Sequence, residues 1–414
     1  MSSEPASIKP GPAEAVATAA PRRDPTVRNV VLLAICQGLA MSGSALTITV
    51  SALVGYSLAE DKALATLPLA LQFAATMVAT MPASLLMQRW GRRAGFSLGA
   101  GFALVSGLVS AQGIFMASFP LFCLGSALFG VATAHAFYYR FAAADTASDV
   151  FKSRAISLVL AGGLVAAFLG PELAKWSRDL FAPVLFAGGF LCIAGLSLLS
   201  LVVLQFISIP RPPAARHRAG GRPLLAIARQ PEYVIAVLCA MVGYGAMNLV
   251  MTSTPLAVIA CEHPFEAAAL VIQWHVVAMF APSFFTGHLI RRFGVLPILT
   301  LGGLLVLACV AVNLSGVEVI QFWTALVLLG VGWNFLFVGG TTLLTETYRP
   351  EEQAKAQGLN DLLVFAVVAL TALSSGMLFD AFGWPAVNLA VVVPVLLVGL
   401  GLAWLARQRA APAA

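Results

Sequence analysis

The stretch QRWGRR at residues 88–93 has a shortened counterpart, RRFG, at residues 291–294 in the other half of the chain. Each stretch follows the second long apolar run of its half. Glycine permits a tight turn between two helices there, and the arginine side chains can interact with helix C-termini and lipid phosphates. Two copies in corresponding loops indicate a chain built from two similar halves. This repeated loop signature comprises Arg89, Gly91, Arg92, Arg93, Gly287, Arg291, Arg292 and Gly294.

Composition places the chain among membrane proteins. Hydrophobic residues make up 60% of the 414 residues and charged residues only 10%, whereas a soluble domain has about 25% charged residues. A helix needs about 20 apolar residues to cross a bilayer. The sequence therefore predicts an all-α polytopic protein with twelve transmembrane helices. The predicted spans are 29–56, 63–87, 95–116, 119–141, 155–173, 183–207, 233–257, 267–290, 296–315, 319–344, 359–379 and 385–405.

Basic residues set the orientation, because cytoplasmic loops of membrane proteins retain Lys and Arg. With both termini cytoplasmic, only three of the 24 basic residues fall outside, namely Lys62, Lys175 and Arg178. The net charge of +6 then follows from topology and does not indicate nucleic-acid binding. The six cysteines lie mostly within predicted helices, so a disulfide framework is not expected.

The predicted helices divide into two groups of six. The segment between them is the longest inner loop and is rich in Pro and Arg. We therefore expect a disordered cytoplasmic tail at 1–26, six-helix bundles at 27–207 and 233–406, a cytoplasmic linker at 208–232 and a cytoplasmic tail at 407–414.

Two pairs of soft metal ligands lie in apolar helices: Met247 and Met251, then His275 and Met279. A step of four places each pair on one helix face. At about 1.5 Å per residue, both pairs lie roughly 10 to 15 Å from the outer helix ends. Thioethers select Cu(I) over hard cations. Methionine packing is the alternative, but a buried imidazole needs a partner, so the four residues predict a mid-membrane copper site.

Three further residues are accessory candidates for a cation. Cys239 shares a helix face with Met247 and could receive the ion at the cytoplasmic side, although a buried thiol is usually a packing residue. Cys261 and His263 lie at the outer mouth, where they could collect a cation or belong to an ordinary polar loop.

A polar group ends the fourth predicted span. Here Arg140 and Asp145 are interpreted as a structural gate pair, and His135 is a candidate proton acceptor. The sequence has no Gly-x-x-x-x-Gly-Lys phosphate loop, which excludes an ATP-driven pump within this chain. We expect a secondary transporter with no covalent chemistry, and thus no enzyme.

The loop at residues 84–93 resembles the signature of the major facilitator superfamily, typically Gly-x-x-x-Asp-Arg-x-Gly-Arg-Arg. Ser84 and Gln88 replace the first Gly and the Asp, and the remaining signature positions match. The resemblance implies two six-helix bundles that rock about a central cavity, with substrate near the midplane. In the family the Asp helps to latch the outward-open state, so a weaker or different latch is expected here.

The two metal-ligand pairs, with Cys239 upstream and Cys261 between them, resemble the motifs of the CcoA-type bacterial copper importers. That branch also contains flavin importers with a similar backbone sequence, and only the Met and Cys positions favour copper. The resemblance implies copper import across the bacterial inner membrane for cytochrome oxidase assembly. Copper would be the substrate, with no permanently bound cofactor. We expect a monomer in the lipid bilayer, with a cytoplasmic copper chaperone as a candidate partner. The alternatives are a flavin (riboflavin) or other organic-solute carrier, and a membrane copper sensor.

Overall fold

Every regular element in the described part of the chain is a helix. The computed structural model describes residues 25–145, 149–209 and 221–410. The first half contains α1 (Pro25–Leu58), the short 3-10 helix η1 (Lys62–Leu64), α2 (Leu67–Trp90), α3 (Arg92–Phe115), α4 (Phe119–Ala136), α5 (Tyr139–Asp145), α6 (Asp149–Ser177) and α7 (Ala187–Leu204).

The second half repeats this plan of long apolar helices with short connections. It contains α8 (Leu224–Ala228), α9 (Pro231–Ala260), α10 (Phe265–Phe280), α11 (Ser283–Phe293), α12 (Val295–Ser315), α13 (Val319–Thr345), the 3-10 helix η2 (Pro350–Glu352) and α14 (Gln353–Ala410). The short α8 lies inside the segment 208–232 that the sequence predicts as a linker. Residues 210–220 of that segment lie outside the described residues.

The two copies of the loop signature have the same backbone conformation. Gly91 separates α2 from α3 with φ 90° and ψ 162°, and Gly294 separates α11 from α12 with φ 88° and ψ 161°. In each copy the glycine N–H donates to the carbonyl four residues earlier, Met87 O or Ile290 O. Glycine adopts this positive φ without a Cβ clash, so two helices join through a single residue.

All twelve predicted spans have a helical counterpart. Nine described helices are individually long and apolar enough to cross a membrane, and α10 with α11 forms a tenth span bent by 44°. The helix α6 has 29 residues. The 58 residues of α14 are interrupted at Gly383, whose φ of 75° is not helical. The segments before and after this glycine correspond to the last two predicted spans. The all-α polytopic fold is therefore confirmed.

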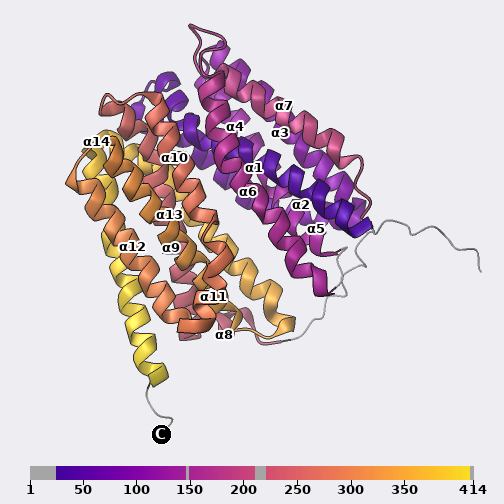
Figure 1. Cartoon of the computed structure of the whole chain (residues 1–414), viewed down its shortest axis with the longest axis vertical. Coiled ribbons are helices and arrows are strands. Elements are labelled where there is room, and N and C mark those ends of the chain that lie inside the picture. The colour runs from indigo at the N-terminus through magenta and orange to yellow at the C-terminus, as the bar shows by residue number, and fades with distance from the viewer. Residues whose placement is uncertain (1–24, 146–148, 210–220, 411–414) are drawn as a thin grey trace, which may run out of the picture.

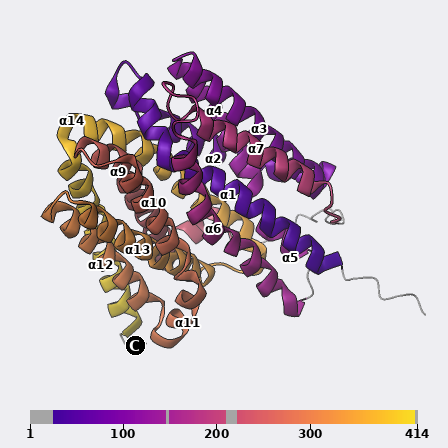
Figure 2. The ribbon, with the colours of Figure 1, turned by 45° about the horizontal axis from the view of Figure 1, so that its top comes forward.

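The two halves lie side by side (Figures 1 and 2). They meet at one end and diverge toward the other, where α8 and the C-terminal end lie. We call the diverging end, which carries the Arg-rich loops, the inner end. The principal helix contacts within the halves join α1 to α6, α3 to α4, α9 to α14 and α12 to α13.

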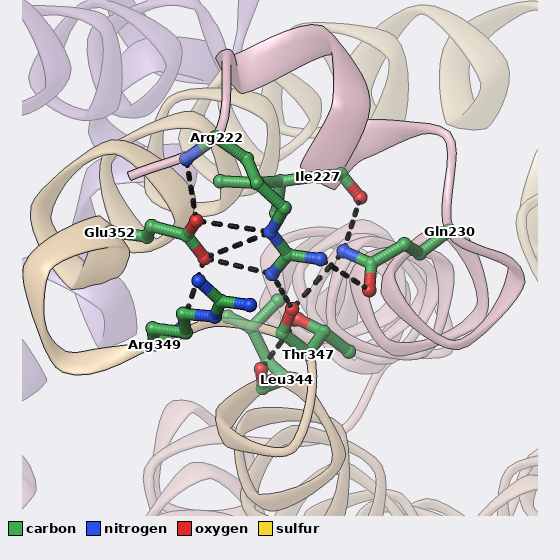
Figure 3. A network of polar contacts seen from close by, with 7 residues as sticks. All are labelled: Arg222, Ile227, Gln230, Leu344, Thr347, Arg349 and Glu352. Carbon is green, nitrogen blue, oxygen red and sulfur yellow. Dashed lines mark hydrogen bonds and ion pairs between the residues drawn. The ribbon is translucent and has the colours of Figure 1, made fainter. Parts of the chain in front are cut away.

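An ion-pair network at the inner end joins the residues before α8 to η2, which directly precedes α14 (Figure 3). Glu352 is fully buried, and its carboxylate accepts from Arg222 N at 2.7 Å, Nε at 3.0 Å and Nη2 at 2.8 Å. It also accepts from the Arg349 backbone N–H at 3.0 Å. Arg222 in turn donates to Thr347 O and Gln230 Oε1. This network holds the described end of the linker segment against the second half.

The Arg222–Glu352 pair has a defined pH dependence. Hydrogen bonds from the Arg222 guanidinium and backbone, and from Arg349, hold the pKa of the Glu352 carboxyl well below its usual value. The same pairing raises the pKa of Arg222. A carboxyl with a lowered folded-state pKa contributes stability above its unfolded pKa of about 4.3. That contribution is lost as the pH falls below this value toward the folded-state pKa.

Replacing Glu352 with Gln should therefore lower the thermal unfolding temperature of the purified protein at pH 7, because charge-assisted hydrogen bonds are lost. The difference from wild type should shrink as the pH is lowered below about 4.3. Thermal unfolding in detergent, followed by intrinsic fluorescence at several pH values, measures both effects. The matched control is Glu351→Gln, which changes the exposed neighbouring residue and should melt like wild type. A Glu352→Gln protein with wild-type stability at pH 7 would contradict this role.

Candidate functional site

A cavity open to solvent lies between the two halves; its empty space, open solvent included, is about 1280 Å³. Helices α1 to α7 line it from the first half, and α9 and α10 line it from the second. Its wall is mainly apolar, and the lining residues include no Asp, Glu, Lys or Arg in the described part of the chain. This wall suits a neutral, largely apolar solute better than a free ion.

The cavity is closed at the outer end by contacts between the halves. Thr66 Oγ1 donates to Leu373 O at 3.3 Å and accepts from Gly376 N at 3.1 Å. Arg178 Nη1 lies 3.7 Å from Glu266 Oε1, and its guanidinium lies 5.4 Å from the centroid of the Phe265 ring. These contacts join the outer ends of α2, α6 and α10 to their neighbours across the interface.

The inner end has the opposite arrangement. The ribbons of the two halves diverge there (Figure 1). The cavity lining extends to Gly99 and Ser200, in the inner halves of α3 and α7, and to Tyr139, where α5 begins. The chain therefore adopts an inward-facing arrangement, with the cavity accessible from the side that carries the Arg-rich loops.

Three of the four predicted copper ligands line this cavity. Met247, Met251 and Met279 are buried in its wall, and the partly buried Met41 from α1 lines it as well. His275 is fully buried and does not line the cavity; its Nδ1 lies 2.7 Å from Leu326 O on α13. The structure thus brings the thioethers together in the wall and places the imidazole at the contact with another helix.

A glycine explains the position of His275. A Cβ on Gly330 of α13 would lie only 2.7 Å from His275 O, so the two backbones pack directly against each other. The imidazole is held in that contact, and its Nε2 has no hydrogen-bond partner. Among the described residues, no group of three or more His, Cys, Asp or Glu side chains is arranged to hold a metal ion.

The three accessory candidates for a cation, Cys239, Cys261 and His263, lie in helix packing or in outer loops. Cys239 is fully buried where α9 packs on α13. The two helices are close there, since a Cβ added to Gly340 would lie 3.4 Å from the Cβ of Cys239. Cys261 follows α9 and is half-buried. His263 Nε2 lies 2.7 Å from Val317 O and joins two outer loops.

The polar group at the end of α4 contains two of the predicted residues within the described part of the chain, His135 and Arg140. His135 is buried, with Nδ1 2.9 Å from Val131 O of its own helix and Nε2 without a partner. Arg140 interacts electrostatically with Asp361 of α14, across the two halves. The side chain of Asp145 lies outside the described residues. Asp361 was overlooked, although a lone acid within a predicted span marks a functional candidate.

The sequence analysis also missed an aromatic group beside the cavity. Tyr244 and Phe280 line the cavity. Tyr244 meets Trp333 and Phe337 edge-on, with ring centroids 5.4 and 5.5 Å apart, and Trp333 stacks on Phe337 at 5.2 Å. The group continues through Phe280 and Phe365. Aromatic walls of this kind bind planar rings by stacked or edge-on contacts.

The outer closure yields a test of the inward-facing arrangement. Replacing Glu266 with Gln removes the ion pair with Arg178, and a partly exposed pair of this kind contributes about 0.2–1 kcal/mol. The outward-facing population should rise by up to about fivefold. The measurement is the rate at which a membrane-impermeant thiol reagent modifies a Cys at Ile48, a cavity position, in a background without other reactive thiols.

Glu318→Gln is the control for this measurement, because Glu318 is an exposed acid at the outer end of α13. It should leave the modification rate unchanged. Equal rates in Glu266→Gln and wild type would show that the Arg178–Glu266 pair does not stabilise the closed outer end.

Comparisons with known proteins agree with this architecture. The chain is 44% identical over 374 residues to the riboflavin transporter RfnT of Brucella anthropi, covering 90% of this chain and 94% of that protein. It is 30% identical over 382 residues to the uncharacterized MFS-type transporter YdeG of Bacillus subtilis, covering 87% and 88% of the two chains.

Two solved structures show the same fold. A variant of the nucleoside transporter NupG matches with a TM-score of 0.71 and 13% identity, over 91% of this chain and 99% of that one. The transporter FucP, in its outward conformation, matches with a TM-score of 0.60 and 16% identity, over 92% and 99% of the two chains. At these identities the structures inform the fold alone.

The prediction of a copper importer is wrong. The similarity to a riboflavin transporter extends over 90% of the chain and supports the flavin alternative instead. The physical reason is that methionine serves equally as a soft ligand and as an adaptable apolar residue in a binding wall. The expected supply of copper to cytochrome oxidase and the copper chaperone depended on that prediction.

The family itself follows from the whole chain. The family model for the Major Facilitator Superfamily matches residues 33–331 and 264–414. The paired helical halves and the inner loop signature agree with that match. This chain belongs to the Major Facilitator Superfamily and is a multi-pass membrane transporter rather than an enzyme.

Proposed function

We propose that the chain carries riboflavin across the bacterial inner membrane into the cell. The observation that carries this proposal is the similarity to a riboflavin transporter along nearly the whole length of both proteins. The proposal concerns the solute, the membrane and the direction; the transporter family is established independently.

The chemistry of the cavity wall supports a flavin. Riboflavin is a neutral planar tricycle with an apolar benzenoid end, a polar imide edge and a hydroxylated tail. The wall offers the aromatic rings of Tyr244 and Phe280, methionine thioethers and the amides of Gln37, Gln72 and Asn248. Methionine sulfur also makes favourable contacts with aromatic rings.

Uptake into a riboflavin-auxotrophic bacterium without its own riboflavin carrier tests the proposal. Cells that express the chain should grow at a low riboflavin concentration and accumulate radiolabelled riboflavin, whereas vector-only cells should not. Replacing Tyr244 with Ala should reduce uptake at normal membrane abundance, because an edge-on aromatic wall is removed. Vector-level uptake with the protein present in the membrane would contradict the proposal.

The methionines provide a second test that separates flavin from copper. Changing both Met247 and Met251 to Leu preserves volume and apolarity, at a cost usually below about 1.5 kcal/mol per site. We expect riboflavin uptake to persist with at most a modest decrease, because only the sulfur–ring contacts are lost, and cellular copper to equal that of vector-only cells for both proteins. Membrane abundance is the control. Copper accumulation that depends on the chain and is lost in the double variant would reverse the assignment.

A further inference from the structure

Two buried amide groups in the cavity wall have carbonyl oxygens without a partner. They belong to Asn248 on α9, which is 0% exposed, and Gln72 on α2, which is 2% exposed. Neither Asn248 Oδ1 nor Gln72 Oε1 accepts a hydrogen bond. A buried acceptor is normally satisfied, so these two oxygens are available for donors that the protein itself does not supply.

The orientation of the Asn248 amide is determined by its neighbours. Its Nδ2 lies 2.9 Å from Val368 O and 3.2 Å from Thr371 Oγ1 on α14. A backbone carbonyl only accepts hydrogen bonds, so the atom beside Val368 O is the amide nitrogen. The carbonyl oxygen of Asn248 is therefore the atom of this amide without a partner, and the two bonds of Nδ2 fix the orientation of the amide.

Gln72 is held on the opposite half of the protein by tight helix packing. Thr76 Oγ1, one turn along α2, lies 3.0 Å from Gly130 O on α4. A Cβ on Gly130 would lie 2.1 Å from Gln72 O, so α2 and α4 make direct backbone contact here. The next residue, Phe73, packs against the same apolar cluster as Tyr244, and that cluster contains Val368. Both amides thus line the cavity, one from each half.

We propose that Asn248 and Gln72 determine solute specificity by accepting hydrogen bonds from the flavin. This inference rests on the proposed function. Asn248 lies one helical turn from Tyr244, so a ring packed against Tyr244 presents its imide N–H to Asn248 Oδ1. Gln72 Oε1 accepts from a hydroxyl of the ribityl tail. The selected class is a planar heterocycle with an imide donor and a polyol tail. Because one acceptor comes from each half, the bound solute connects the two halves.

The imide contact is tested with lumiflavin, which keeps the imide N–H and lacks the tail, and with 3-methyllumiflavin, in which a methyl group replaces that hydrogen. Each is used to inhibit radiolabelled riboflavin uptake. A site built around a hydrogen bond rejects an analogue that lacks the donor. In wild type, half-maximal inhibition should need at least about tenfold more 3-methyllumiflavin than lumiflavin.

Replacing Asn248 with Leu removes the acceptor but retains bulk. Half-maximal inhibition by lumiflavin should then need about the same concentration as inhibition by 3-methyllumiflavin. Lumiflavin loses the hydrogen bond of its imide N–H, while binding of the methylated analogue is unaffected. A purely steric preference would instead leave lumiflavin as effective as in wild type, and that result would overturn the proposal. Asn248→Ser, whose small hydroxyl can bond to its own helix, provides a second variant should the Leu protein fail to reach the membrane.

Asn313→Leu is the matched control. Asn313 is also a buried amide with an unpartnered Oδ1, but it bonds to Asn388 and does not line the cavity. Its replacement should leave the ratio between the analogues unchanged. Gln72→Leu should reduce the advantage of riboflavin over lumiflavin and leave the lumiflavin to 3-methyllumiflavin ratio intact.

The outcomes separate this inference from the proposed function. Absence of riboflavin uptake by the wild-type chain would contradict the function itself. Normal riboflavin uptake with equal inhibition by the two analogues, or an unchanged ratio in the Asn248 variants, would overturn the assigned acceptors and leave the function standing.

Discussion

The dominant physical constraint on this protein is the absence of water around its helices in the bilayer. A polar group there needs a partner within the protein, and helices satisfy the backbone internally. Most buried side chains follow the same rule: Thr49 and Thr254 each donate to a carbonyl four residues earlier on their own helix. The exceptions are therefore informative. Two of them, on Asn248 and Gln72, lie in the wall of the cavity between the halves.

The two ends of the molecule have different roles within this constraint. At the outer end, Thr66 and Arg178 join the halves through a hydrogen bond and a partly exposed ion pair, which are individually weak and can open. At the inner end, the buried Glu352 binds Arg222 within the second half. These outer contacts are few and partly exposed, whereas Glu352 is buried and accepts several hydrogen bonds within the second half. Rocking of the halves requires this combination.

The sequence predicted those features that depend on apolar length and on glycine conformation. Twelve apolar runs and the turns at Gly91 and Gly294 needed no tertiary information. A four-residue step correctly grouped Met247 with Met251, but it could not show that His275 would face Leu326 of α13 while Met279 faces the cavity. That difference arises from the close approach of α10 to Gly330. The aromatic wall and the Arg222–Glu352 pair combine residues from distant segments, which periodicity cannot reveal. The prediction of copper as the solute was also wrong, because thioethers suit both soft ions and flat rings.

The central claim is that the cavity between the halves carries a flavin. Counterflow tests it most directly, because exchange of labelled for unlabelled solute needs no knowledge of a driving ion. Purified protein is reconstituted into liposomes loaded with unlabelled riboflavin, and entry of external radiolabelled riboflavin is followed over time. The account predicts a transient accumulation of label well above that in protein-free liposomes. No accumulation above protein-free liposomes, with correctly inserted and monodisperse protein, would contradict it.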